Sequence, residues 1–221
     1  METELQFGPV FAHLDRLVFG LGETLLLAAL SILFGTAIGL TGALSRAYGP
    51  RWLSWPVAAY VELIRNTPLL VQLYFVFFTL PLIGLKLSPN AAAIVALSVH
   101  LGAYATEILR AGVESIAPGQ IEAAKSLGLG RWQIIRLVVV RPALQAVYPS
   151  LSAQFVLQLM GTSIVGAIAA EELTAIANNL VMQTFRSFEV YILLAVIYFV
   201  LVQAASVCLA GVGRLAFRWK T

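Results

Sequence analysis

Five stretches without a charged side chain constrain the fold of this chain more than any other feature. They cover residues 24–45, 66–85, 87–106, 142–170 and 190–213. Each reaches the roughly 20 residues that a helix needs to cross about 30 Å of hydrocarbon. The bilayer interior offers no water to backbone groups, so a spanning segment is a helix or a strand of a closed barrel, and period-two alternation is absent from these stretches. The sequence therefore predicts an all-α integral membrane protein with five transmembrane helices.

The composition indicates one membrane domain that covers residues 1–221. Hydrophobic residues make up 60% of the chain and charged residues 11%, with a mean hydropathy of +0.88. An ordinary soluble domain contains roughly 25% charged residues. No linker rich in Pro, Gly or Ser divides the sequence. The expected spans are approximately 24–45, 56–84, 88–114, 143–169 and 189–213.

Lysine and arginine residues predict the orientation, because they are retained in the cytoplasmic connections of membrane proteins. One set of connections contains Arg46, Arg51, Lys125, Arg131, Arg136, Arg141, Arg214, Arg218 and Lys220. The opposite set contains Arg16, Lys86 and Arg186. We therefore expect the N-terminus outside, the C-terminus in the cytoplasm and residues 116–141 in a long cytoplasmic loop. The net charge of +3 reflects this orientation, and no nucleic-acid partner is expected.

The long loop has the pattern of two helices joined by a break. Residues 122–127 predict a short helix, Gly128 and Gly130 a break, and residues 131–140 a second helical stretch. The second stretch carries apolar side chains, among them Trp132, on a loop that faces water. Such side chains are unfavourable in water unless a partner or the helix ends cover them.

Several classes of function lack the residues that they need. With one cysteine, Cys208, and two histidines, His13 and His100, the chain provides no disulfide and no metal cluster. It has no phosphate loop of the form Gly-x-x-x-x-Gly-Lys-[Ser/Thr] and none of the common hydrolase motifs. We therefore expect no enzyme activity of its own and no bound metal. An intramembrane enzyme stays as a rival interpretation, as does a secondary transporter, although that class usually shows internal repeats and more spans.

A short motif within the loop, at residues 119–128, carries a family resemblance. It reads Gly-Gln-Ile-Glu-Ala-Ala-Lys-Ser-Leu-Gly and resembles the EAA loop of ATP-binding-cassette (ABC) importer permeases, in which Glu-Ala-Ala is followed four positions later by Gly. Other segments are similar to the polar amino acid branch of that family, which includes histidine, glutamine, arginine and opine-like importers. In chain order they are Gly22-Glu23-Thr24-Leu25, Arg65-Asn66-Thr67-Pro68-Leu69-Leu70-Val71-Gln72-Leu73, Ala103-Tyr104, Glu107, Arg110-Ala111-Gly112, Thr162-Ser163, Glu172-Leu173, and Thr184-Phe185-Arg186 with Tyr198.

This resemblance implies a type I ABC importer permease fold and the uptake of a polar amino acid or a similar small zwitterion. It also implies the partners: a second permease, identical or homologous, two ATPase subunits that hold ATP and Mg²⁺, and an extracytoplasmic solute-binding protein. The location implied is the bacterial cytoplasmic (inner) membrane, with no cofactor on this chain. The residues expected to couple the chain to the ATPase are Glu122, Ala123, Ala124, Gly128, Arg131 and Trp132. Small alanines allow close approach of a helix to its partner, and Gly128 provides backbone freedom.

The fourth span carries a stripe of uncharged hydrogen-bonding residues. Gln154, Gln158 and Thr162 are spaced by four and share one side of a helix, with Gly161 at the same face and Ser163 beside it. Amides and hydroxyls commonly bond between membrane helices, so the stripe fits helix packing. The family resemblance favours a translocation path equally well. Both interpretations stay open at this point.

The chain departs from the family pattern at several positions. Ala153, Met160 and Gly161 stand where the branch usually has Asn and a Lys-Asp pair. These changes indicate either the less substrate-engaged half of a heterodimer or a less demanding solute, such as a compatible solute. A proline also comes one residue late, at Pro142, so Arg141 is expected to be extended and the second loop helix to stop near Val140.

Two pairs of opposite charges lie close to hydrocarbon, where an unpaired charge is costly. Glu62 and Arg65 are three residues apart, as are Glu107 and Arg110, so each pair is expected to interact and to serve structure or gating.

Three further residues within spans are expected to serve packing. Gly35 and Gly39 have the spacing that lets two helices meet backbone to backbone. His100 is expected to be a hydrogen-bonded packing residue.

Overall fold

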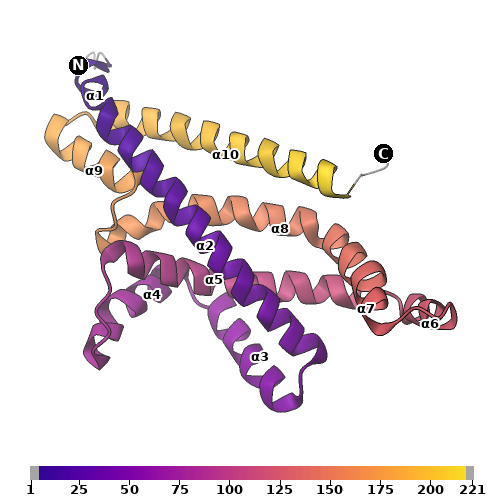
Figure 1. Ribbon diagram of the computed structural model, residues 1–221. Helices are drawn as coiled ribbons and strands as arrows, with labels where there is room; N and C mark the ends of the chain where they lie inside the picture. The colour runs from indigo at the N-terminus through magenta and orange to yellow at the C-terminus, as the bar shows by residue number, and fades with distance from the viewer. Residues whose placement is uncertain (1–4, 218–221) are drawn as a thin grey trace.

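The computed structural model describes residues 5–217 and, within that range, contains helices and their connections with no strand (Figure 1). The α-helices are α1 (Gly8–Phe11), α2 (Leu14–Tyr48), α3 (Arg51–Arg65), α4 (Leu69–Tyr74), α5 (Pro89–Glu114), α6 (Pro118–Ser126), α7 (Arg131–Gln133), α8 (Arg141–Gly161), α9 (Leu173–Thr184) and α10 (Ser187–Phe217). The π-helical turns are η1 (Phe75–Thr79) and η3 (Ile134–Val140), and the 3₁₀ turns are η2 (Leu80–Ile83) and η4 (Thr162–Ile168). Two of the basic residues used to predict orientation, Arg218 and Lys220, lie outside the described residues.

Across residues 5–217, four continuous segments are long and apolar enough to cross a membrane. They are Leu14–Tyr48, Pro89–Glu114, Arg131–Ile168 and Ser187–Phe217. The expected span at 56–84 is instead a pair of segments, Arg51–Arg65 and Leu69–Ile83, bent by 111°. The bend lies just before Pro68, because proline disfavours helical geometry in the residue that precedes it. The membrane-spanning architecture is confirmed, with the second span broken into two.

The close contact of α2 with α5 forms the centre of the fold. A Cβ atom added at Gly39 would lie 2.4 Å from the Cβ of Ala105, and one added at Gly35 would lie 2.8 Å from Leu101. Neither position has room for a side chain. The structure therefore confirms that these glycines pack one helix against another.

The N-terminal end of α2 is held by the start of α9. Glu172 is fully buried in the connection before α9, and its carboxylate accepts hydrogen bonds from the N–H groups of Thr174 (2.8 Å) and Ala175 (2.7 Å). The Tyr198 hydroxyl of α10 donates to the same carboxylate at 3.1 Å. Thr24 of α2 accepts a hydrogen bond from the N–H of Leu173. Burial raises the pKa of the Glu172 carboxyl above its usual range, while these donors oppose that shift. Glu172 thus caps α9 and links it to α10.

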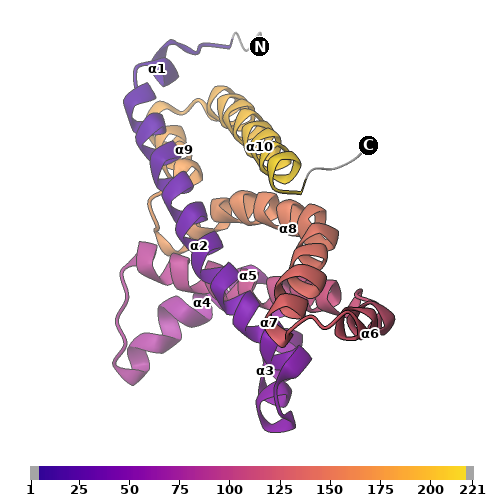
Figure 2. The same ribbon diagram turned by 45° about the vertical axis from the view of Figure 1, so that its right-hand side comes forward.

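The last helix, α10, lies along the side of the molecule next to α8 (Figure 2). Val190 and Leu194 near its start pack on the cluster formed by α2 and α9. Towards its end, the Tyr148 hydroxyl of α8 donates to the carbonyl of Leu209, and Gly213 fits against the Tyr148 ring. Between these two attachments much of α10 is exposed.

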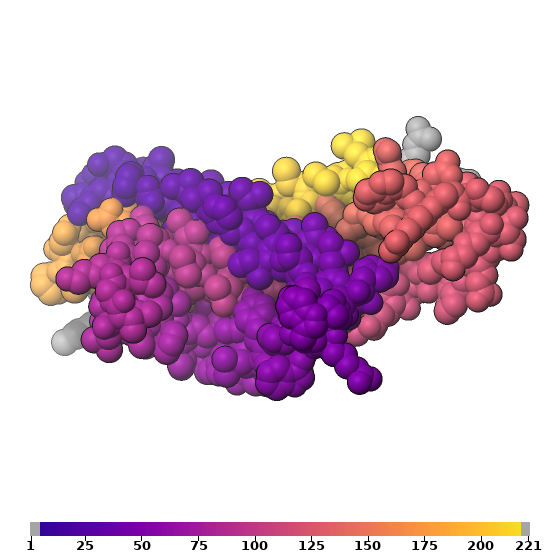
Figure 3. All heavy atoms as spheres, turned by 60° about the horizontal axis from the view of Figure 1, so that its bottom comes forward, coloured from indigo at the N-terminus to yellow at the C-terminus, as the bar shows by residue number. Residues whose placement is uncertain are grey.

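The segment from α6 to η3 protrudes at one end of the molecule (Figure 3). From this protrusion the chain continues through η3 directly into α8. Arg141 has φ −65° and ψ −50°, so the expectation of an extended Arg141 and a helix end near Val140 is wrong. Pro142 occupies the first turn of α8, and the π-helical turn before it shifts the hydrogen-bond register, which accommodates a proline without a break.

We expect Glu172→Ala to lower the free energy of unfolding by about 1–3 kcal/mol, because α9 loses its cap and buried donors lose their acceptor. The matched control is Glu171→Ala at the neighbouring exposed position, with an expected change within about 0.5 kcal/mol. Thermal unfolding in detergent, followed by circular dichroism, measures both. Equal melting temperatures for the two variants would contradict the role of Glu172 as a cap.

Candidate functional site

A small hollow of about 160 Å³ is lined by residues of α5, of α8 and of the start of α4. Its lining combines apolar side chains with four polar ones. When His100 is neutral, none of the lining side chains is charged. The lining residues are Leu69, His100, Tyr104, Gln154, Leu157, Gln158 and Gly161. Three residues of the predicted stripe on the fourth span therefore lie together at this hollow.

Gln158 serves mainly to join helices. Its side chain is 2% exposed, and its amide nitrogen donates to the Ser31 hydroxyl of α2 at 3.1 Å and to the Leu97 carbonyl of α5 at 2.9 Å. One amide thereby connects three helices at the centre of the fold. For this residue the packing interpretation has direct structural support.

Gln154, one turn earlier on α8, is different. It lines the hollow, is half-buried, and makes no side-chain hydrogen bond within residues 5–217. Its donors and acceptor are therefore available to a molecule in the hollow. Gly161 lines the same hollow. A Cβ atom added there would lie 3.5 Å from Leu69, an ordinary contact distance, so the space beside this glycine is open.

The other two stripe residues do not reach this hollow. The Thr162 hydroxyl is buried and donates to the carbonyl of Leu159 at 2.7 Å. The Ser163 hydroxyl donates to the carbonyl of Met160, and its side chain lines a separate groove beside α10. Here η4 winds as a 3₁₀ turn, with 3.0 residues per turn, so the i, i+4 spacing assumed for a straight α-helix no longer holds.

The hydrogen bonds around Gln72 fix how His100 presents its ring. The Gln72 amide nitrogen donates to the carbonyls of Ile64 and Thr67 and to the Thr67 hydroxyl. Its amide oxygen then faces His100 Nδ1 at 3.1 Å, so the neutral ring carries its proton on Nδ1. This bond gives His100 the packing contact predicted for it. It also leaves Nε2 as the acceptor of a side chain that lines the hollow.

The predicted pair Glu62 and Arg65 is not formed. Glu62 instead accepts a hydrogen bond from Asn66 at 3.0 Å. The guanidinium of Arg65 lies over the ring of Tyr104, 5.4 Å from its centroid. Both residues lie in the last turn of α3, so helical spacing would allow the pair, but each side chain is engaged by another partner. Arg65 thus places a cation next to a residue of the hollow.

The other predicted pair is formed and is part of a larger cluster. Glu107 accepts from Arg110 at 2.7 Å, and it also pairs with Arg46 of α2. Arg110 extends the cluster to Glu114 one turn later. The cluster joins the ends of α2 and α5 on the side of the protruding loop. Alternating signs keep each half-buried charge paired.

The two arms of the protruding loop pack on each other. Ala124 of α6 is buried against Ile134 and Val139 of η3. Gly128 between the arms has φ +75°, a left-handed conformation that glycine adopts without steric cost. The N–H of Gly130 donates to the Gln133 side chain at 2.9 Å and starts the second arm. The helix, break and second helix predicted for the loop are all present.

The outer surface of the loop carries exposed apolar side chains and exposed charged side chains. Leu127 is 81% exposed and Trp132 is 80% exposed. Glu122, Ala123 and Arg131 are also exposed. All the residues expected to couple with a partner therefore lie on the protrusion, with Ala124 and Gly128 shaping it from within or between its arms. Nothing within residues 5–217 covers the Trp132 ring.

Two residues were not identified from sequence as site residues: Tyr104 lines the hollow, and Gln72 bonds to His100 beside it. Gln72 and Tyr104 both lie in segments that carry the family resemblance, but their spacing gave no sign that they would meet His100 and Arg65. A glutamine in an otherwise apolar segment was the available signal for Gln72, since a buried amide needs partners.

Comparison with known proteins gives a consistent result along nearly the whole chain. A family described as "Binding-protein-dependent transport system inner membrane component" matches residues 19–213. The chain is 33% identical to the glutamine transport system permease protein GlnP of Escherichia coli (strain K12) over 214 residues, which cover 96% of this chain and 97% of that protein. It is 40% identical to the probable glutamine ABC transporter permease protein GlnP of Bacillus subtilis (strain 168), covering 85% and 87%.

Solved structures show the same similarity in three dimensions. An amino acid ABC transporter, crystallised with histidines, has a chain that superimposes with a TM-score of 0.88 at 33% identity, covering 96% of this chain and 99% of that one. The inward-facing MetNI methionine ABC transporter gives a TM-score of 0.71 at 24% identity, with coverage of 93% and 98%. The latter likeness concerns the fold alone.

We expect Gln158→Leu to lower the free energy of unfolding by about 0.5–2 kcal/mol, because its amide bonds to α2 and α5 are lost inside the membrane. Gln154→Leu is the matched control on the same helix, and its expected change is smaller because no described hydrogen bond is removed. Thermal unfolding of the two purified variants separates these outcomes. The joining role of Gln158 fails if both variants unfold like the original protein.

Proposed function

Because this chain belongs to the family of binding-protein-dependent transport system inner membrane components, we propose that it is the permease subunit of an ABC importer for an amino acid. The observation that carries this proposal is the match to amino acid permeases along 85% or more of the chain at 33–40% identity. The all-α membrane fold and the amino acid transporter neighbour support it. The chain serves as a transport subunit, and its relatives do not favour a secondary transporter or an intramembrane enzyme.

The complete importer contains further subunits. A second permease, identical or homologous, lies beside this one, two ATPases bind on the cytoplasmic side, and a solute-binding protein docks on the other side. ATP and Mg²⁺ are bound by the ATPases, and this chain binds no cofactor. The location is the bacterial inner membrane, with the N-terminus outside. The basic residues of the loop and of the end of α10 support this orientation, since such residues are retained in the cytoplasm.

The protruding loop transmits the movement of the ATPases. Exposed Trp132 and Leu127 give it an apolar surface for a protein partner, flanked by the charges of Glu122 and Arg131. The packing of α6 on η3 makes the two arms one stiff unit. Because η3 continues into α8, a displacement of this unit acts on a continuous helix that reaches Gln154.

The hollow on α8 contributes to the translocation path. An amino acid carries a carboxylate and an ammonium group, so its path needs hydrogen-bonding groups. Gln154 and the Nε2 atom of His100 provide such groups. Arg65, stacked on Tyr104, adds a cation that attracts the carboxylate. The amino acid solutes of the relatives favour this class over a compatible solute.

We expect Gln154→Leu to reduce uptake about 5-fold or more, because the hollow loses its unpaired amide and each hydrogen bond is worth about 1 kcal/mol. The measurement is uptake of radiolabelled amino acid by proteoliposomes containing the full importer. Leu157→Ala, which changes an apolar residue of the same hollow, is the control, with a smaller expected effect. Unchanged uptake by Gln154→Leu would remove this residue from the path.

A second prediction concerns Gly128. Gly128→Val forces a β-branched residue into a left-handed conformation, at a cost of about 1–2 kcal/mol, although a Cβ there meets no other atom within 4 Å. We expect the variant to insert normally but to lose several-fold in solute-stimulated ATP hydrolysis by the reconstituted complex. Gly128→Asn is the matched control, since asparagine tolerates this conformation, and it should retain most of the stimulation.

The same preparation tests the proposed function as a whole. Purification of this chain from its native membrane should bring an ABC ATPase with it, and ATP should drive accumulation of an amino acid. Accumulation that follows an ion gradient without ATP, or a preparation without any ATPase, would overturn the importer assignment.

A further inference from the structure

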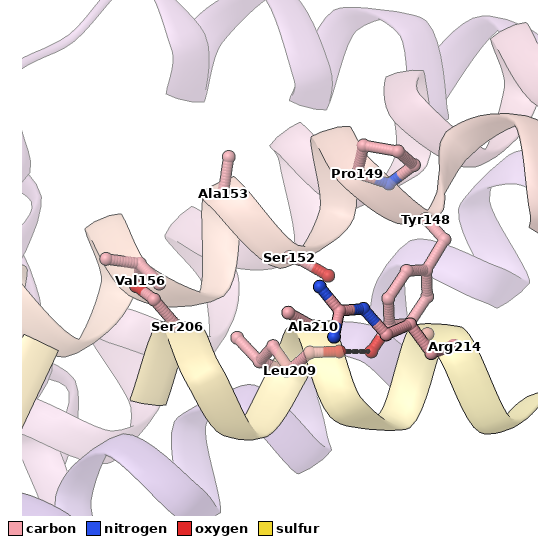
Figure 4. Close-up of a pocket in the computed structure, with 10 residues that line it drawn as sticks. Tyr148, Pro149, Ser152, Ala153, Val156, Ser206, Leu209, Ala210 and Arg214 are labelled. Carbon is pink, nitrogen blue, oxygen red and sulfur yellow. Dashed lines mark hydrogen bonds between the residues drawn. The ribbon is translucent and has the colours of Figure 1, made fainter. Parts of the chain in front are cut away.

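A groove of about 420 Å³ separates α8 from α10 along the second half of α10 (Figure 4). It extends from Tyr148 to Val156 on α8 and from Arg214 back to Ser206 on α10. The rise from the first to the last of these residues is roughly 12 Å on each helix. The groove is apart from the hollow at Gln154 and from the protruding loop, and neither proposed role uses it.

The lining of this groove changes character along its length. Towards Val156 and Ala210 it is formed by small and apolar side chains, which leave the space between the helices open. At the other end lies Arg214, whose guanidinium points across to the Ser152 hydroxyl of α8 (Figure 4). The Ser152 oxygen is buried and has no hydrogen-bond partner among the described residues. The groove thus has an apolar part and a polar, positively charged end.

Arg214 lacks a counter-charge in this part of the chain. No acidic residue between positions 5 and 217 forms an ion pair with it. It lies one turn before the end of α10, on the side where the basic residues gather, so the proposed orientation puts it at the inner leaflet. A cation at that depth needs an anionic partner, because an unpaired charge close to hydrocarbon is costly.

We propose that this groove binds an anionic phospholipid of the inner leaflet. The phosphate is held by Arg214, next to the buried Ser152 hydroxyl, and the first part of one acyl chain lies along Ala210 towards Val156. Basic pockets between membrane helices on the cytoplasmic side are suited to anionic headgroups. A free phosphate would satisfy the arginine alone, whereas an acyl chain also fills the apolar part. The inference rests on the proposed orientation but on no step of transport.

Lipid retention by the intact purified complex tests the proposal. Native mass spectrometry counts phosphatidylglycerol and phosphatidylcholine, with identical acyl chains, that stay bound after the same detergent wash. We expect Arg214→Gln to weaken phosphatidylglycerol binding about fivefold, with little change for phosphatidylcholine. Arg51→Gln, at an exposed arginine on α3, is the matched control and should bind like the original protein.

A second variant tests the apolar part. Ala210→Leu fills the groove and should reduce phosphatidylglycerol retention severalfold, whereas Ala204→Leu on another face of α10 should not. Equal retention in all four variants would overturn the proposal. Displacement of the lipid by millimolar inorganic phosphate would also overturn it, because the site would then be a phosphate site.

The groove also has a competing occupant, a second copy of the permease. A photoreactive benzoylphenylalanine in place of Val207, an exposed residue three positions before Ala210 on the same side of α10, should crosslink to lipid without filling the groove. A crosslink to the second permease would overturn the lipid assignment. Since ATP-driven uptake is measured separately, failure of lipid binding is distinguishable from failure of the proposed function.

Discussion

The close approach of α2 to α5 is the contact on which the rest of the structure depends. In a bilayer the lipid tails are as apolar as the helices, so association comes from van der Waals packing and interhelical hydrogen bonds. Gly35 and Gly39 bring the two backbones together, and two polar links add to that contact. Gln158 joins α8 to both helices, and Glu107 joins their ends through arginines. The result is a closely packed body of three helices.

The remaining elements are attached to this body with different stiffness. The loop at Ala124 and Ile134 is joined to it directly, because η3 continues into α8 without a break. By contrast α10 touches the body near Val190 and again near Tyr148, with grooves between. A helix attached at two places leaves grooves along α8 that are separate from the hollow at Gln154.

Much of this architecture could be predicted because the bilayer leaves few alternatives. The lack of charge over about 20 residues predicted the spans, and Gly128 with its neighbours predicted the loop. Some of the predictions that were wrong concern positions where the helix is not a regular α-helix. Arg141 is helical because a π-turn accommodates Pro142, and Thr162 turns away from the hollow because η4 is a 3₁₀ turn. Spacing rules for a straight α-helix contain neither effect.

The charged residues show a related limit of prediction. The sequence gives the separation of two residues along the chain, but it does not give the other partners that each side chain meets in space. Glu107 and Arg110 met as predicted because α5 is regular across both. Glu62 and Arg65 did not, although both lie in α3, because Glu62 accepts from Asn66 and Arg65 stacks on Tyr104 instead. The break after this pair brings Gln72 of α4 to His100 and thereby sets the histidine tautomer. The interruption of the α-helix before Pro68 therefore gives the hollow polar surroundings that spacing along the chain does not contain.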